Sequence, residues 1–120
     1  VEEYERAFFG TSANVQVDPD HVPELVVESV AAALRERFGF EARSFGQGVA
    51  LSEVVAVTQA VPGVVMVDVD RLYRVLPDGK AAQSQPFLEA RSPRPGEEGA
   101  VHPAELLTLD PNELRLEMLQ

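Results

Sequence analysis

The sequence contains no cysteine, which excludes disulfides, thiolate nucleophiles and cysteine-ligated metal sites. It is also poor in basic residues, with 10 Lys and Arg against 20 Asp and Glu, so the net charge is −10. Because phosphate recognition depends largely on Lys and Arg, a nucleic-acid partner is disfavoured. No apolar run approaches the ~18 residues of a membrane span, and no signal-peptide pattern opens the chain. We therefore expect a cytoplasmic protein with no membrane partner.

The length of 120 residues, with 45% hydrophobic and 25% charged residues, is typical of one globular domain covering residues 1–120. The sequence does not begin with Met, so we expect a fragment of a longer subunit. Charge is uneven: residues 31–76 carry five acids and five bases, whereas both flanks are acidic. A neutral stretch is cheaper to desolvate against another surface than a charged one.

Two strands and one long helix are predicted by hydrophobic periodicity. Alternation predicts strands over residues 8–17 and 64–75, the second with its odd-numbered valines buried. Between them, 3–4 spacing predicts a helix over residues 23–38, with Pro23 in its first turn. Its expected apolar stripe comprises Val22, Leu25, Val26, Val30, Ala33, Leu34 and Phe38.

A second, shorter helix is expected to start with Ser52 as its N-cap and to end at Pro62-Gly63. The segment 77–103 is rich in Pro and Gly, which favours an extended loop and a contact segment. A helical turn is expected over 103–107, a turn at Asp110-Pro111-Asn112 and a last strand over 113–119. The order strand–helix–helix–strand–loop–strand predicts an α+β fold, with two helices packed on one face of a small three-stranded sheet.

Carboxylates and histidines offer few candidate sites. Asp68 and Asp70 share one strand face and could serve a metal or a hydrolase, although a solvent-facing strand explains them better. A cluster of Asp18, Asp20 and His21 is compatible with a weak cation site, but turn chemistry before a helix is the simpler interpretation. His102 has no second ligand at metal-binding spacing. We expect neither a metal nor a cofactor.

Glycine and arginine groups are equally inconclusive. Gly46-Gln47-Gly48 could cradle a phosphate, but no Lys or Arg follows at P-loop spacing, so a tight turn is favoured. Arg35, Arg37 and Arg43 alternate with glutamates, which is typical of a solvated face. No set of residues supplies a nucleophile, a base and an oxyanion donor together, so we expect no catalysis.

Three short motifs, in this order and spacing, resemble a known family. They are Arg43-Ser44-Phe45-Gly46-Gln47, Leu51-Ser52-Glu53-Val54 and Val61-Pro62-Gly63-Val64, within a similar stretch from Ala13 to Arg74. This stretch resembles the C-terminal part of baseplate J-like proteins, the baseplate assembly (wedge) proteins of contractile phage tails and tail-like injection particles. The resemblance covers about half of the chain.

The resemblance implies a structural subunit that assembles with other baseplate subunits and with itself, without a small-molecule substrate. It implies that the chain becomes part of a tail or tail-like particle. Structural turn or assembly roles would fall on Arg43, Phe45, Gly46, Gln47, Ser52, Glu53, Pro62 and Gly63. Of these, Gly46 and Gly63 are expected where a Cβ would clash or where φ is positive. Two alternatives stay open, a small-molecule-binding regulatory α+β domain and a hydrolase that uses Asp68 and Asp70.

Overall fold

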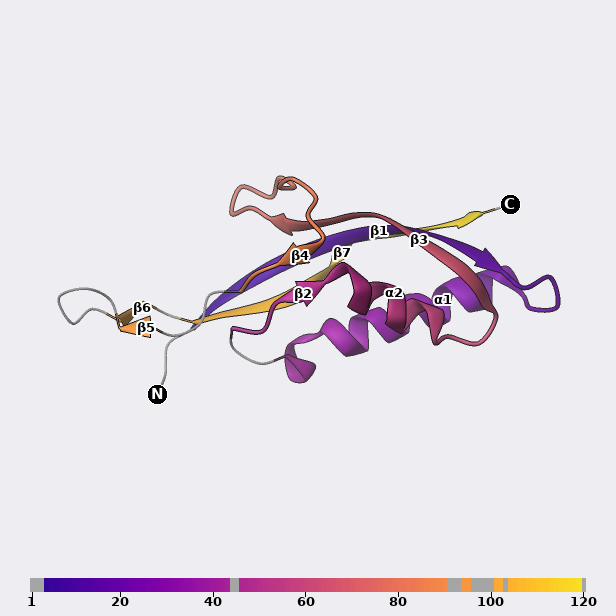
Figure 1. Ribbon diagram of the computed structural model, residues 1–120, viewed down its shortest axis with the longest axis horizontal. Coiled ribbons are helices and arrows are strands. Elements are labelled where there is room, and N and C mark those ends of the chain that lie inside the picture. Colours follow the sequence, from indigo (N-terminus) through magenta and orange to yellow (C-terminus); the bar gives the residue numbers. More distant parts are fainter. Residues whose placement is uncertain (1–3, 44–45, 91–93, 96–100, 103, 120) are drawn as a thin grey trace.

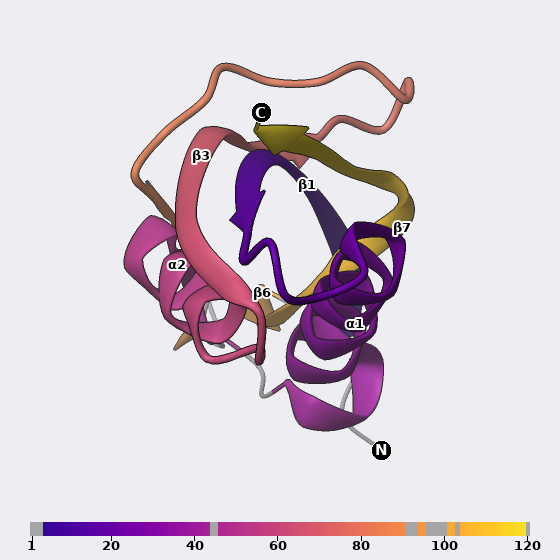
Figure 2. The ribbon, with the colours of Figure 1, turned by 90° about the vertical axis from the view of Figure 1, so that its right-hand side faces the viewer.

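The computed structural model describes residues 4–43, 46–90, 94–95, 101–102 and 104–119. Its centre is a three-stranded sheet in the order β3 (Val64–Val75), β1 (Tyr4–Val17) and β7 (Ala104–Leu119) (Figure 1). Helices α1 (Pro23–Phe38) and α2 (Leu51–Gln59) cover one face of this sheet, and the chain that follows β3 loops on the other side (Figure 2). The predicted α+β architecture, with two helices on one face of a three-stranded sheet, is confirmed.

The central strand β1 (Tyr4–Val17) pairs with one neighbour in each direction. It is antiparallel to β3 (Val64–Val75) and parallel to β7 (Ala104–Leu119). Its buried side chains, Phe9, Thr11, Ala13 and Val15, alternate along the strand, as expected for a face covered by helices. The strand begins at Tyr4 rather than near residue 8, because its first residues pair with the start of β7.

Helix α1 (Pro23–Phe38) has the predicted bounds, with Pro23 in its first turn. Its buried residues, Val26, Val30, Leu34 and Phe38, recur every four positions. The predicted apolar stripe was wrong at its first two positions, because Val22 is 54% exposed and Leu25 is 60% exposed. Successive helical residues are rotated by roughly 100°, so Leu25 lies well off the stripe that Val26 begins.

The connection from α1 runs through a short 3-10 helix (Phe40–Ala42) and strand β2 (Val49–Ala50) into α2 (Leu51–Gln59). Ser52 is not the N-cap, because α2 begins at Leu51 and Ala50 occupies the cap position. The backbone N–H of Leu51 donates to the Pro86 carbonyl at 2.8 Å. Pairing with this later segment therefore sets where the helix starts.

Strand β3 has the predicted bounds, but its alternation is interrupted twice. Register shifts lie between its pairs with Ser12 and Ala13 and between its pairs with Gln16 and Val17. Asp70 and Val65 are the extra residues at these two bulges. The shift at Asp70 moves the buried face from odd to even positions, and Leu72 is accordingly fully buried.

The Pro/Gly-rich segment is not wholly a loop. Strand β4 (Phe87–Leu88) pairs with β2, and β5 (Arg94–Pro95) pairs with β6 (Val101–His102). Leu88 is 1% exposed and belongs to the core, so this segment contributes to the fold as well as connecting strands.

The helical turn expected over 103–107 was wrong, because β7 already starts at Ala104. The predicted turn at Asp110-Pro111-Asn112 lies inside this strand as a bulge, where the register passes from Phe9↔Leu109 to Thr11↔Leu114. The Asp110 carboxylate accepts from the Asn112 N–H at 3.0 Å, which closes the turn locally. Partners from β1 thus override the local turn signal.

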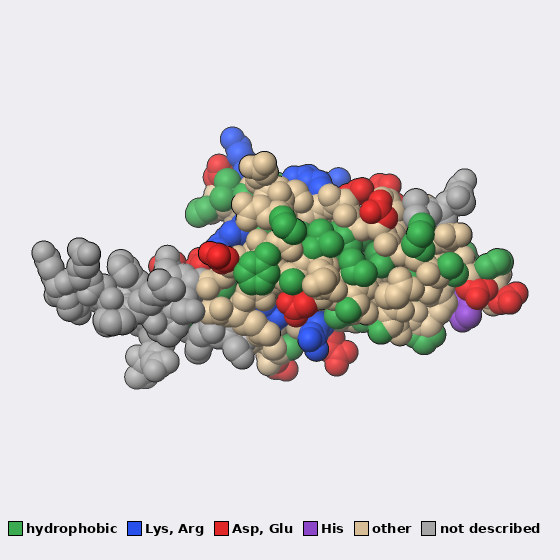
Figure 3. Space-filling view, viewed as in Figure 1, with side chains coloured by type: hydrophobic (Ala, Val, Ile, Leu, Met, Phe, Trp, Pro, Cys, Tyr) green, Lys and Arg blue, Asp and Glu red, His purple; other side chains and the backbone are tan. Residues whose placement is uncertain are grey.

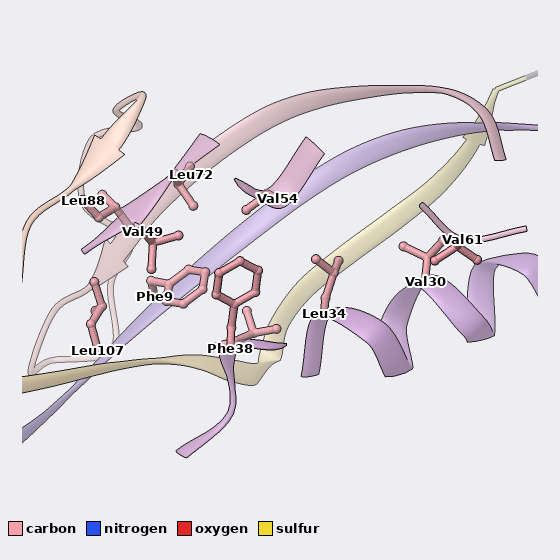
Figure 4. Close-up of a cluster of buried hydrophobic side chains, with 11 residues drawn as sticks. Phe9, Val30, Leu34, Phe38, Val49, Val54, Val61, Leu72, Leu88 and Leu107 are labelled. Carbon is pink, nitrogen blue, oxygen red and sulfur yellow. The ribbon is translucent and has the colours of Figure 1, made fainter. Parts of the chain in front are cut away.

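The core lies between the sheet and the two helices (Figure 4). The Phe9 and Phe38 rings meet edge to face with centroids 5.5 Å apart, which joins the central strand to the last turn of α1. Val49 of β2 and Leu88 of β4 join the same cluster from the connecting segments, and Leu107 joins it from β7. Burying a side chain such as Phe38 contributes about 2–3 kcal/mol.

Candidate functional site

The first of the family-like motifs is organised by Arg43, whose side chain is only 8% exposed. Its Nη2 donates to the carbonyls of Gln47 at 3.2 Å and Gly48 at 2.6 Å, and its Nε donates to the Leu107 carbonyl at 3.3 Å. The guanidinium also lies over the Phe38 ring, 5.3 Å from its centroid. Burial lowers the pKa of Arg43, although the nearby Glu53 carboxylate opposes this shift.

Arg43 was expected on a solvated face, and that interpretation was wrong. The arginine fork instead connects the turn at 47–48 to β7, so the residue has an architectural role. Arg37 fits the solvated description better, since its side chain is 59% exposed and it lies 3.9 Å from Glu53.

The two motif glycines have positive φ angles, as predicted. Gly46 has φ +72° and its N–H donates to the Glu105 carbonyl at 2.9 Å. Gly63, after the exposed Pro62, has φ +94°, and a Cβ there would approach Val26 Cγ2 to 2.8 Å. Both positions therefore favour glycine for backbone reasons.

The remaining motif residues are divided between the surface and the helix start. Glu53 Oε1 accepts from the Ala50 N–H at 3.1 Å and so satisfies a free donor at the start of α2. Ser52 and Gln47 are exposed. Phe45 lies outside the described residues. The structure thus brings Arg43, Gly46 and Glu53 to the α1–α2 connection, whereas Pro62 and Gly63 lie at the far end of α2.

The cluster before α1 shows turn chemistry. Asp18 Oδ1 accepts from the Asp20 N–H at 2.8 Å, and the His21 N–H donates to the Asp18 carbonyl at 3.0 Å. Within the described part of the chain, no group of three or more His, Asp or Glu residues could hold a metal. The side chain of His102 lies outside the described residues.

Asp68 and Asp70 are both exposed on β3. Asp70 lies at a bulge and accepts from Asn14 Nδ2 at 3.1 Å. Asp68 is paired opposite Asn14, and Asp70 also lines a polar hollow on the sheet face opposite the helices.

The sheet face opposite the helices contains a polar hollow of about 390 Å³, which we call the open-face hollow. Its lining includes Ser12, Asn14, Arg71, Tyr73, Glu113 and Arg115. Tyr73 donates its hydroxyl to Glu113 Oε2 at 2.8 Å, and the Arg71 guanidinium lies 4.6 Å from the ring centroid. Burial, together with this hydrogen bond, raises the pKa of Tyr73 to about 12.

The sequence reasoning did not anticipate this hollow or the ion pair between Arg74 and Glu105. Arg74 Nη2 lies 2.6 Å from Glu105 Oε2, and Arg74 Nη1 donates to the Glu89 carbonyl at 2.7 Å. The sequence did contain a signal for the hollow, because polar residues recur at every second position in 64–75 and 113–119. These residues come together only because β3 and β7 both pair with β1, and the local sequence pattern does not predict that pairing.

The two edges of the sheet differ. Along β3, the returning segment 80–85 bonds to Leu72, Arg74 and Leu76, and Gln59 Nε2 donates to the Val64 and Val65 carbonyls. Between these contacts, residues 66–71 of β3 have no such partner among the described residues, and the two bulges, at Val65 and Asp70, lie at or near the two ends of this stretch. Bulges and side-chain contacts of this kind discourage strand addition.

Along β7, the Arg43 motif covers the first half of the outer edge through Glu105 and Leu107. In the described part of the chain, the stretch Leu114–Met118 is paired only with β1. We call this stretch the terminal edge. Its pairing with β1 is continuous and contains no bulge, unlike the stretch of β3 between Val65 and Leu72.

A shallow groove of about 480 Å³ separates the terminal edge from α1. Val27, Ala31, Leu116 and Met118 line its floor, and Met118 is 47% exposed. Charged side chains, Glu24, Glu28 and Arg35, border it along the helix. On the face drawn in Figure 3, hydrophobic side chains also gather over the middle of the molecule among charged ones.

No protein-family model matches this chain, and no curated protein matches it in sequence. None of the described helices is both long and apolar enough to cross a membrane.

Proposed function

We propose that this chain is a non-catalytic assembly domain and a structural subunit of a contractile phage-tail or tail-like baseplate. The observation that carries the proposal is the terminal edge of β7, an open strand edge beside an apolar groove. Strand addition at such an edge is a common way to join proteins, because main-chain hydrogen bonds supply affinity with little shape requirement.

The motif residues support this proposal through their positions. Arg43, Gly46 and Gly63 act on backbone conformation and packing, as expected of residues that preserve a scaffold. The baseplate assignment rests on the resemblance of these motifs to baseplate J-like proteins. Partners would be other baseplate subunits, assembled in the cytoplasm before the finished particle is released or used.

The test is to locate the chain in a particle. Contractile tails purified from the source cells would be labelled with gold-conjugated antibodies against this chain and viewed by electron microscopy. Label at the baseplate end of the tail supports the proposal. Tail particles without label, or cells that produce the chain but no tail particles, would overturn it.

A small-molecule-binding regulatory domain is the second candidate, favoured by the open-face hollow with Arg71, Arg115 and Tyr73. Three acids, Asp70, Glu113 and Glu117, line the same hollow, so a small ligand that carries both charges, such as an amino acid, fits it better than an anion. A thermal-shift screen with amino acids tests it: a saturable rise in Tm that Arg71→Ala abolishes supports this candidate, and no rise excludes that ligand class.

A further inference from the structure

From the charge pattern of β7 we infer that the terminal edge pairs with the same edge of a second copy of this chain, in antiparallel orientation about Leu116. The inference rests on the proposed assembly function and names its first partner. The pairing would join two three-stranded sheets into one six-stranded sheet with all four helices on one face. Both copies present the same face because the two-fold axis runs perpendicular to the sheet.

The side chains of the terminal edge alternate between two surfaces. Leu114 and Leu116 pack towards the core on the helix side, as partly buried members of its cluster. Glu113, Arg115 and Glu117 line the open-face hollow on the other side. In antiparallel pairs the directly opposed residues lie on the same side, so the register decides which charges meet.

Registers can be compared by the pairs that they create. With Leu116 opposite itself, Arg115 of each copy faces Glu117 of the other, and Leu114 faces Met118. With Arg115 opposite itself, Arg115 meets Arg115 and Glu113 meets Glu117. With Glu117 opposite itself, two acids meet at the axis. Opposite charges stabilise a cross-strand pair and like charges destabilise it, so these two registers are disfavoured.

The register about Leu114 is excluded for a different reason. It also pairs Arg115 with Glu113, but it extends the contact to Pro111, inside the bulge between Leu109 and Leu114. Proline lacks an N–H, and a bulge interrupts the hydrogen-bond ladder. The register about Leu116 is therefore the one that the strand favours.

The groove beside the terminal edge repeats this complementarity. Along α1, Glu24 and Glu28 lie towards one end of the groove and Arg35 lies at the other. The same two-fold axis sets the two α1 helices antiparallel, so the Arg35 end of each faces the Glu24 end of the other. Val27, Ala31 and Met118 of both copies would then cover one another. An unrelated protein strand would not have this self-complementary pattern.

The decisive experiment is a charge swap followed by sedimentation equilibrium of the 120-residue chain. We expect a reversible dimer at protein concentrations up to about 1 mM, the weak end of specific binding. Arg115→Glu places two acids opposite each other at two symmetry-related positions, and Glu117→Arg places two arginines there. Each variant should raise the dimer Kd by roughly tenfold or more, because both pairs change from attractive to repulsive.

The double variant R115E/E117R restores opposite charges with the original net charge and should return the Kd to within about threefold of the wild-type value. Matched controls are Lys80→Glu and Glu41→Arg, which make the same charge changes at exposed positions away from the terminal edge and from α1. These controls should leave the Kd unchanged. Circular dichroism checks that every variant is folded.

A monomer at all concentrations overturns the inference, as does a dimer whose Kd is insensitive to both single swaps. Failure of the double variant to recover dimerisation also overturns the antiparallel register. None of these outcomes affects gold labelling of tail particles, so self-pairing and the baseplate role can fail separately. Binding of a different protein strand at this edge would appear as a monomer in this assay.

Discussion

Replacing Arg43 by Met tests whether the buried guanidinium holds the α1–α2 connection to β7. Methionine retains much of the apolar stem but removes three hydrogen bonds to the carbonyls of Gln47, Gly48 and Leu107. A hydrogen bond from a charged group contributes about 1.5–3 kcal/mol, and two of these three are long, at 3.2 and 3.3 Å. We therefore expect the free energy of unfolding to fall by about 3–4 kcal/mol.

Such a loss is a large part of the roughly 5–15 kcal/mol stability of a typical domain. For a chain of this size it corresponds to a fall in Tm of roughly 12–16 °C. Urea titration followed by far-ultraviolet circular dichroism measures the unfolding free energy, and thermal scans measure Tm. Arg43→Lys should lie between wild type and Arg43→Met, because lysine keeps the charge but lacks the planar fork.

Arg37→Met is the matched control, since its side chain is exposed and its contact with Glu53 is long. An exposed pair of this kind contributes less than about 1 kcal/mol, and we expect a change of that size or smaller. If Arg43→Met were as stable as Arg37→Met, the architectural role assigned to Arg43 would be wrong.

Three further predictions concern single sites. The raised pKa of Tyr73, about 12 against an ordinary 10.0, means that the unfolded chain loses this proton first as pH rises. Stability should therefore fall between pH 10 and 12 in urea titrations, and Tyr73→Phe should reduce that fall. The buried Thr58 hydroxyl has no hydrogen-bond partner among the described residues, so Thr58→Val should raise the unfolding free energy by about 1 kcal/mol, whereas a loss of stability would point to an unseen bond. Gly63→Ala should lower the unfolding free energy by about 1–3 kcal/mol, because φ is positive there and the added Cβ would meet Val26. Gly79→Ala should lower it less, because φ is also positive but no atom lies within 4 Å of the added Cβ. Equal losses in the two variants would exclude a steric contribution at Gly63.

The candidate site was only partly predictable from the sequence. Positive φ at Gly46 and Gly63 and turn chemistry at Asp18 follow from local residue preferences, and these predictions are confirmed. The burial of Arg43 was missed because its acceptors include Leu107, 64 positions away. The baseplate role stays a prediction, tested by gold labelling of tail particles, and the absence of catalysis also stays a prediction.

Local periodicity by itself determined the bounds of α1 and β3 and the layer of helices on one sheet face. Only the tertiary structure decided that β7 starts at Ala104, because there a parallel ladder pairs residues 100 positions apart, such as Tyr4 with Ala104. The same long-range pairing absorbs the Asp110-Pro111 turn as a bulge and moves Leu72 into the core after the bulge at Asp70. Side-chain spacing records which face of a segment is apolar, whereas the identity of the neighbouring strand depends on contacts that form only when the whole chain folds.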